Sequence, residues 1–492
     1  MNKPKSFSHA LKWAYTGNWG DRALSSIFIF LLAGILGPQD FGIAAIAATY
    51  VAFLQIFLDQ GLAAALIQKK DLEPSHLDSV FWTNIALSVF LILVSLPFSR
   101  WWAVRNHAPE AARMIPVLSV AILIEAVSLV QTAILKKDLD FKSLSIRTNA
   151  AALIGGVSGV AMALGGLGVW SLIGQQLIRD LSAVVLLWNL SGWRPRFQFS
   201  WIHLKDLLAF SIPNFVAQLG IFLDSQAASV ALGLLFGPLA VGLYRIADRV
   251  VGSVIMVAMA SIQAVSFPEF SRLQDQPEEL HKSVLTCIRL SSAATLPALA
   301  GLIAVGNPLM EVLGAKWVPA SGVLKILSLL GMLVIFSYFT VPLLQALAKT
   351  RAVAGLEWGR TIAGLAVLVA AGLYVRNSPV QVQIMGIALS RFITGGVLIL
   401  PVFAYVLMKL SQVTLRELLS SVAPAALSAG SIILAVTALH LSGWLSDQKA
   451  IMLLIVETIL GGAVGVLVLL GMDTSLRKSI KSLLDRRFVA AL

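Results

Sequence analysis

Long apolar stretches, most of them about 20 residues in length, alternate with short polar segments along the whole chain. A helix of about 20 residues spans the ~30 Å hydrocarbon core of a bilayer, because each residue adds about 1.5 Å. The first apolar run, Leu24–Gly37, is too short by itself, so we expect its helix to begin near Asn18. The pattern predicts an all-α integral membrane protein with about 14 transmembrane helices, near residues 18–36, 43–66, 79–98, 115–135, 147–167, 169–189, 209–235, 242–265, 285–306, 321–346, 352–374, 382–407, 420–440 and 450–471.

Basic residues are distributed unevenly between the two sides of this predicted topology. If the N-terminus is cytoplasmic, the inner segments hold 25 of the 37 Lys and Arg residues, the outer loops hold 6, and the other 6 lie within spans. Cytoplasmic loops of membrane proteins carry an excess of Lys and Arg. We therefore expect a multi-pass protein with both termini in the cytoplasm.

Composition excludes several classes of function. The chain has 492 residues, of which 58% are hydrophobic and only 13% are charged, whereas a soluble domain carries about 25% charged residues. The net charge of +12 suits anionic lipids or an anionic substrate, and apolar runs of this length exclude nucleic acid as the partner. The single cysteine, Cys287, and the lack of a Cys/His motif predict no metal site and no cofactor.

The loops also limit the chemistry that the chain can perform. Every connection between predicted spans is short, so no soluble catalytic domain can fold from them. The sequence contains no GxxxxGK[ST] loop for binding a nucleotide. We therefore expect a secondary transporter and not an enzyme.

One short motif occurs twice, 200 residues apart. GPQDFG at 37–42 and GPLAVG at 237–242 share the pattern GPxxxG, and each lies in an outer hairpin after an odd-numbered helix. Gly and Pro favour any tight turn, but the equivalent positions indicate duplication of a six-helix unit in parallel orientation. This predicts an N-terminal lobe at 1–205, a C-terminal lobe at 206–410, and two further helices with a basic cytoplasmic tail at 411–492.

Several segments together resemble a known family. The chain is similar to the Wzx-type polysaccharide and O-antigen flippases, in particular the colanic-acid-exporter-like branch of the multidrug/oligosaccharidyl-lipid/polysaccharide (MOP) exporter superfamily. The segments that carry this resemblance are LGPQDFG (36–42), DQGLAAALIQKKDL (59–72), LKKDLDFKSLS (135–145), FPEFSRLQ (267–274), VLGAKWVPA (312–320) and LLQALAKTRA (343–352).

The resemblance implies two six-helix lobes around a central cavity that opens alternately to each side of the bacterial inner membrane. It also implies flipping of an undecaprenyl-pyrophosphate-linked oligosaccharide repeat unit to the outer leaflet for surface or exopolysaccharide biosynthesis. Expected partners are this cargo, membrane lipids and polysaccharide polymerase or export machinery, and we expect a monomer. The glycan itself is not implied.

Charged residues within predicted spans are candidates for the transport site, because a charge at bilayer depth requires a partner or a cavity. The resemblance places helices one, two, seven and eight around the cavity. Arginine can hold a pyrophosphate through its permanent planar fork. The candidates for such a cationic path are Arg22, Arg245, Arg249 and Arg391.

Acidic residues near these arginines leave a second interpretation open. Asp21, Asp59 or Asp248 can form gating salt bridges with Arg22 and Arg249, and Asp248 can also pair with Arg245. Asp224 is predicted near the membrane midplane, where an acid can bind a proton or Na⁺ or can pair with Arg249. H⁺ or Na⁺ coupling of transport is therefore an expectation.

Other charges in the spans have structural interpretations. Glu357 and Arg360 are three residues apart and are predicted to pair with each other. Arg179 with Asp180, Glu125 and Glu457 are interpreted as partners in helix packing.

Two alternatives to the flippase hypothesis stay open. One is a transporter of the same fold for another cargo, such as the peptidoglycan lipid precursor or a cationic drug, although excess arginine disfavours a cation. The other is a membrane-embedded glycan polymerase or ligase, which the small outer loop at 99–114 disfavours.

Overall fold

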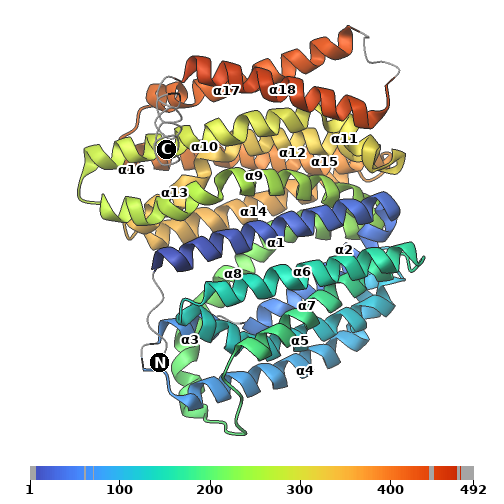
Figure 1. Ribbon diagram of the computed structural model, residues 1–492, viewed down its shortest axis with the longest axis vertical. Helices are drawn as coiled ribbons and strands as arrows, with labels where there is room; N and C mark the ends of the chain where they lie inside the picture. The colour runs from blue at the N-terminus through green and yellow to red at the C-terminus, as the bar shows by residue number, and fades with distance from the viewer. Residues whose placement is uncertain (1–6, 60–61, 70, 443–447, 474–476, 478–492) are drawn as a thin grey trace, which may run out of the picture. The chain divides into compact units, whose positions relative to one another are not determined.

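The computed structural model describes residues 7–59, 62–69, 71–442, 448–473 and 477, and the chain forms two compact units. Unit 1 comprises Met1–Arg245 with Gly372–Gln383, and unit 2 comprises Ile246–Ala371 with Ile384–Leu492. All regular elements in the described residues are helices (Figure 1). The predicted lobe boundaries at 205 and 410 stay a prediction, because compact units reflect packing and not duplication.

Unit 1 contains the first eight helices and the start of the ninth. They are α1 (Phe7–Ile35), α2 (Pro38–Asp59), α3 (Leu62–Gln68), α4 (Pro74–Arg105), α5 (Ala111–Lys137), α6 (Phe141–Leu164), α7 (Trp170–Leu190), α8 (Trp201–Phe236) and the first turns of α9 (Pro238–Arg272).

Unit 2 contains most of α9 and nearly all the remaining elements. These are α10 (Pro277–Ala304), α11 (Gly306–Leu313), η1 (Ala315–Ala320), α12 (Ser321–Leu333), η2 (Val334–Phe336), α13 (Ser337–Ala346), α14 (Thr350–Tyr374), α15 (Val380–Phe392), η3 (Ile393–Ile399), α16 (Leu400–Ser411), α17 (Leu415–Leu441) and α18 (Ala450–Met472). The end of α14 and the start of α15 belong to unit 1.

The helices account for the predicted spans. Ten are long and apolar enough to cross a membrane, or eleven if the bent pair Pro238–Ala260 and Ile262–Arg272 counts as one span, within the described residues. The other three predicted spans coincide with α1, α6 and α7, which are helical but less uniformly apolar. A multi-pass membrane protein is confirmed, and a total of fourteen spans is consistent with these helices.

Helix starts follow local capping rules. Glu73 and His76 form a capping box at the start of α4, with Pro74 in the first turn, where its missing N–H is tolerated. Thr414 and Glu417 form a second capping box at the start of α17. The Asp140 carboxylate accepts a hydrogen bond from the Ser143 N–H, 3.2 Å away, at the start of α6.

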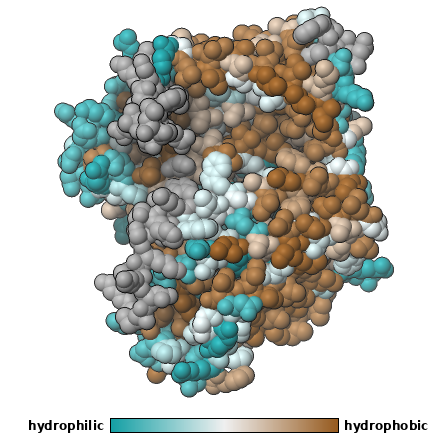
Figure 2. All heavy atoms as spheres, viewed as in Figure 1, coloured by the Kyte–Doolittle hydropathy of each residue, from teal (hydrophilic) through white to brown (hydrophobic). Residues whose placement is uncertain are grey.

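Apolar side chains cover much of the outside of the helices, as lipid contact requires. Exposed large side chains include Phe90 and Leu93 on α4 and Leu434 and Leu467 on α17 and α18. Figure 2 shows hydrophobic residues over α17 and α18, which lie side by side in Figure 1. Exposed apolar surface on this scale marks a lipid-facing protein.

The beginning of α1 differs from the sequence prediction. The helix starts at Phe7, before the expected Asn18. Its early turns pack closely on α6, where the Ser145 hydroxyl donates to the Trp13 carbonyl at 2.6 Å and Asn149 donates to the Gly17 carbonyl at 3.2 Å. Apolar length alone could not show this, because contacts with α6 stabilise the polar part of the helix.

The two GPxxxG motifs meet inside unit 1. A Cβ added at Gly42 would overlap the Pro238 carbonyl oxygen, and one added at Gly242 would overlap the Pro38 carbonyl oxygen. The contact is reciprocal, as between two copies of one unit related by a two-fold axis. Glycine is thus required at both positions, because the start of α2 approaches the start of α9 too closely for any side chain.

Candidate transport site

An ion pair links the first and seventh helices of unit 1. The Arg179 guanidinium on α7 lies 2.7 Å from the Asp21 carboxylate on α1 and also donates to the Ser25 hydroxyl at 3.1 Å. Gly155 on α6 faces Arg179, and a Cβ there would lie 2.6 Å from the Arg179 Cβ. This close packing fixes the stem of Arg179, so the guanidinium is directed to α1.

Asp180 lies next to Arg179 on α7. It accepts hydrogen bonds from the Gln176 amide at 2.9 and 3.1 Å and interacts electrostatically with Arg179 and with Arg147 on α6. Arg147 also donates to the Thr132 hydroxyl on α5 at 3.0 Å. Polar side chains therefore link α1, α5, α6 and α7, which agrees with the packing interpretation of Arg179 and Asp180.

Arg22 is exposed, in contrast to its neighbour Asp21. Since Asp21 is bound to Arg179, its carboxylate is already engaged within unit 1. The structure thus supplies a partner for one of the two adjacent charges and leaves Arg22 at the surface of α1.

Arg245 is held by uncharged groups. Its guanidinium donates to the Gln226 amide oxygen at 3.2 Å and lies 3.5 Å from the Ser229 hydroxyl, both on α8. Gln226 also accepts from the Thr49 hydroxyl on α2 at 3.5 Å. Asp248 was expected to be able to pair with Arg245, but the hydrogen-bond acceptors of Arg245 are two uncharged side chains on α8.

Asp224 lies half-buried on the same helix as Gln226. Aromatic rings pack α8 against α2 nearby, with Phe222 5.8 Å from Phe53 and Phe215 5.3 Å from Phe57 between ring centroids. Asp224 is thus placed on a well-packed helix. Asp59 ends α2, and its side chain lies outside the described part of the chain.

The other candidate residues belong to unit 2. Arg249 is exposed on α9, and Asp248 and Arg391 are half-buried on α9 and α15. Arg391 lies two residues before the π-helical segment Ile393–Ile399. Such segments are rare and occur frequently at functional sites.

The predicted pair of Glu357 and Arg360 is confirmed at 2.8 Å. The Tyr338 hydroxyl on α13 lies within electrostatic reach of Arg360 and Arg391.

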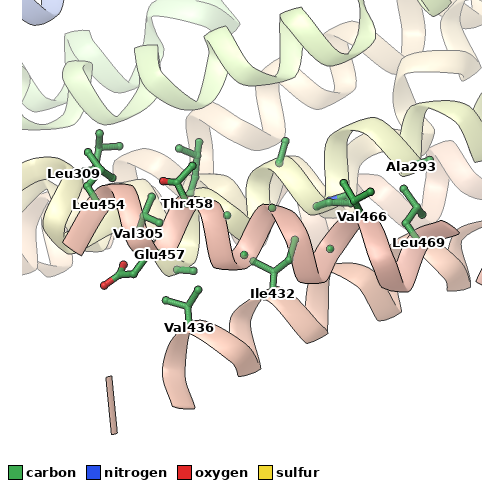
Figure 3. Close-up of a pocket in the computed structure, with 18 residues that line it drawn as sticks. Ala293, Val305, Leu309, Ile432, Val436, Leu454, Glu457, Thr458, Val466 and Leu469 are labelled. Atoms are coloured by element: carbon green, nitrogen blue, oxygen red, sulfur yellow. The ribbon is translucent and has the colours of Figure 1, made fainter. Parts of the chain in front are cut away.

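Glu457 lines a cavity of about 500 Å³ between α10, α11, α17 and α18. Its carboxylate lies 3.0 Å from the His440 ring on α17, so its interpretation as an inter-helix partner is confirmed. Figure 3 shows Ile432 and Val436 from α17 and Val466 from α18 among the mostly apolar lining. The cavity suits an apolar group rather than a charged one.

Comparison with known proteins identifies the family. A model described as polysaccharide biosynthesis protein matches residues 31–322, which is more than half of the chain. The chain belongs to this family.

Three curated relatives agree with this assignment. The succinoglycan biosynthesis transport protein ExoT of Rhizobium meliloti is 28% identical over 66% of this chain and 66% of its own length. The teichuronic acid biosynthesis protein TuaB of Bacillus subtilis is 26% identical, over 57% of this chain and 59% of its own length. The lipopolysaccharide biosynthesis protein WzxC of Escherichia coli is 25% identical, over 67% of this chain and 68% of its own length. The chain thus matches about two thirds or less of the length of these relatives.

Solved structures show the fold. The lipid II flippase MurJ in an inward closed conformation matches 95% of this chain and 99% of its own, with a TM-score of 0.73 and 13% identity. An inward-facing MATE family transporter of the MOP superfamily matches 80% of this chain and 95% of its own, with a TM-score of 0.61 and 18% identity. The chain is therefore a member of the polysaccharide biosynthesis family and has the fold of these MOP-type proteins, as the sequence resemblance predicted.

The pairing of Arg179 with Asp21 could not be found from the sequence. The two residues are 158 positions apart, and neither spacing nor periodicity connects them. The sequence shows only that a charge within a span is costly and therefore needs a partner; it does not show which residue that partner is.

Proposed function

We propose that this protein flips undecaprenyl-pyrophosphate-linked oligosaccharide repeat units from the cytoplasmic to the outer leaflet. Membership of the polysaccharide biosynthesis family carries the proposal. Two relatives support it: ExoT is a succinoglycan biosynthesis transport protein, and WzxC is a lipopolysaccharide biosynthesis protein. The reaction moves the cargo and makes or breaks no covalent bond.

The distribution of charge supports an anionic cargo. Asp21 is engaged by Arg179, while Arg22 next to it is exposed on α1. Arg249 is likewise exposed on α9, and Arg391 is half-buried beside a π-helical segment. Arginine side chains that keep contact with solvent can bind a pyrophosphate as it leaves water. Arg245 serves as a further positive charge, positioned by α8.

Transport is driven by an ion gradient or by the membrane potential, with alternating access of a central cavity. Asp224 is the acid proposed to carry H⁺ or Na⁺, because it is a half-buried carboxylate on a predicted span. Asp59 and Asp248 are proposed to act in gating, whereas Asp21 is engaged by Arg179 within unit 1. The protein acts as a monomer in the bacterial inner membrane, with both termini in the cytoplasm, and passes its cargo to polymerase or export machinery.

Deletion of the gene tests the proposal in cells. Undecaprenyl-linked oligosaccharides are extracted from spheroplasts of the deletion strain, with and without treatment by a glycosidase that cannot cross the membrane. The proposal predicts accumulation of one oligosaccharide that the glycosidase does not reach. Unchanged levels of all such lipids would contradict it.

The same deletion strain distinguishes the proposed cargo from the alternative one, the peptidoglycan lipid precursor. The overall fold resembles that of a lipid II flippase. If the chain carries the peptidoglycan precursor, its expression supports growth of cells depleted of their own lipid II flippase, and the deletion accumulates lipid II in place of a surface-polysaccharide repeat unit.

A further inference from the structure

Three side chains with metal-binding groups meet in unit 1, and none of them is a candidate transport residue. Glu73 caps the start of α4, His76 lies in its first turn, and His203 lies in the first turn of α8. One ring nitrogen of each histidine and one carboxylate oxygen lie within 4.8 Å of one another. Within the described part of the chain they form the only such group of three.

We propose that Glu73, His76 and His203 bind one Zn²⁺ ion. Two histidines and one carboxylate make a common set of zinc ligands, and a water molecule completes the four-coordinate geometry. The His76 and His203 rings are 4.5 Å apart between centroids and nearly perpendicular. The sequence predicts no metal site because His203 and Glu73 are 130 positions apart, with none of the spacing that marks a zinc motif.

His203 is already oriented as a ligand. Its Nδ1 lies 2.6 Å from the Ser200 hydroxyl, and its Nε2 lies 3.1 Å from the Glu73 carboxylate. A metal-binding histidine typically donates its other ring N–H to a neighbouring oxygen, which fixes the tautomer. With the Nδ1–H donated to Ser200, Nε2 presents its lone pair towards Glu73.

His76 contributes a second observation that points to a ligand. Its side chain is only 2% exposed, and its Nε2 is buried without a hydrogen-bond partner. Buried polar atoms in proteins almost always have a partner. Its Nδ1 accepts a hydrogen bond from the Glu73 N–H at 3.2 Å. While Nδ1 accepts this bond, the ring proton is on Nε2; a metal at Nε2 displaces that proton to Nδ1, so the capping bond from the Glu73 N–H is lost when the metal binds.

The surrounding contacts keep the two helix starts together. The Asp78 carboxylate accepts from the Arg196 N–H at 2.9 Å, and the Ser79 hydroxyl accepts from the Ser200 N–H at 2.9 Å. The segment before α8 is thus attached to the first turns of α4 by protein groups alone. The ion adds a further connection and holds His203 at the start of α4.

Zinc binding to the purified full-length protein tests the proposal. The protein, with any histidine tag removed, is stripped of metal in detergent and titrated with Zn²⁺ against a chelating indicator. The wild type is expected to bind one equivalent, and His203→Ala and Glu73→Gln are expected to bind at least tenfold more weakly. The Glu73 side chain is exposed, so the Gln variant is expected to fold like the wild type.

A matched control comes from unit 2. The His281 Nε2 lies 3.2 Å from the Glu417 carboxylate, which is the same kind of His–Glu pair without a third ligand in the described residues. His281→Ala is expected to keep full affinity, and Zn²⁺ should raise the unfolding temperature of this control and the wild type but not of His203→Ala. Equal Zn²⁺ affinity in the wild type, His203→Ala and Glu73→Gln, or no binding at micromolar Zn²⁺, would overturn the proposal. Neither result depends on the cargo.

Discussion

Arg179 and Asp21 form an ion pair at 2.7 Å between helices that the sequence separates by 158 positions. Their side chains are 31% and 21% exposed, so the pair is partly withdrawn from solvent. The pair explains how two charges are tolerated at membrane depth. It also distinguishes Asp21 from Arg22, which is exposed on the same helix.

Loss of this pair should destabilise the protein. A hydrogen bond to a charged group contributes about 1.5–3 kcal/mol, so Asp21→Asn is expected to lower the free energy of unfolding by that amount. The exposed pair Glu269–Arg272 has the same 2.7 Å distance, but its Arg is 71% exposed. Glu269→Gln is therefore expected to lower it by less than about 1 kcal/mol. Thermal unfolding in detergent compares the two variants, and an equal effect would contradict a structural role for Asp21.

Gly42 and Gly242 should tolerate no side chain. Gly42→Ala and Gly242→Ala each place a Cβ against a backbone carbonyl oxygen, of Pro238 and Pro38, and so should sharply reduce the folded yield in the membrane. Gly252→Ala on α9 is the control, because a Cβ there meets no atom within 4 Å. Alanine in a helix is favoured over glycine by about 0.5–1 kcal/mol, so this control should be as stable as the wild type or more stable. Size-exclusion profiles of the three variants give the comparison, and normal yield for Gly42→Ala would refute the close approach.

The sequence predicted helices and local pairs well, but not contacts between distant segments. All fourteen apolar stretches coincide with helices, because lipid requires long apolar runs. Glu357 and Arg360 were paired correctly, since a spacing of three places both on one helix face.

Partners from different helices could not be predicted. Arg245 meets Gln226 and Ser229 rather than Asp248, and His203 meets Glu73, because tertiary packing and not spacing decides these contacts. The GPxxxG repeat was predicted only in part. Its turns were predicted, and the reciprocal contact of Gly42 and Gly242 with the two prolines was not.

Positive charge at Arg22 and Arg249 should be needed for export. Arg→Lys variants are expected to keep most activity, Arg→Gln variants to lose about tenfold or more, and Arg→Glu variants to lose all of it, because a charge-assisted bond to the pyrophosphate is lost. Arg376→Gln, an exposed arginine in a predicted outer loop, should export normally. The readout is the surface polysaccharide per molecule of protein in the membrane. Rescue of Arg249→Asp by Asp59→Arg or Asp224→Arg would contradict cargo contact and favour gating.

Asp224 should set the dependence of transport on the ion gradient. Asp224→Asn removes the group that binds the ion but retains its shape, so the variant is expected to fold and bind cargo while flipping becomes independent of pH or Na⁺. The exposed Asp275→Asn variant, which changes a predicted cytoplasmic loop, should keep the gradient dependence. Vesicles with imposed H⁺ or Na⁺ gradients provide the measurement. Normal gradient dependence in Asp224→Asn would return Asp224 to a structural role.

The proposed flipping of a lipid-linked oligosaccharide can be measured with the purified protein in proteoliposomes. Vesicles contain a fluorescent undecaprenyl-pyrophosphate-linked oligosaccharide, and an enzyme confined to the outside modifies only the sugar in the outer leaflet. With the wild-type protein under an ion gradient, we expect the fluorescent lipid of the inner leaflet to reach the outer leaflet and become accessible to the enzyme. With Arg22→Glu, this lipid is expected to stay protected. Protection that is equal in protein-free, wild-type and Arg22→Glu vesicles would contradict the proposed flipping.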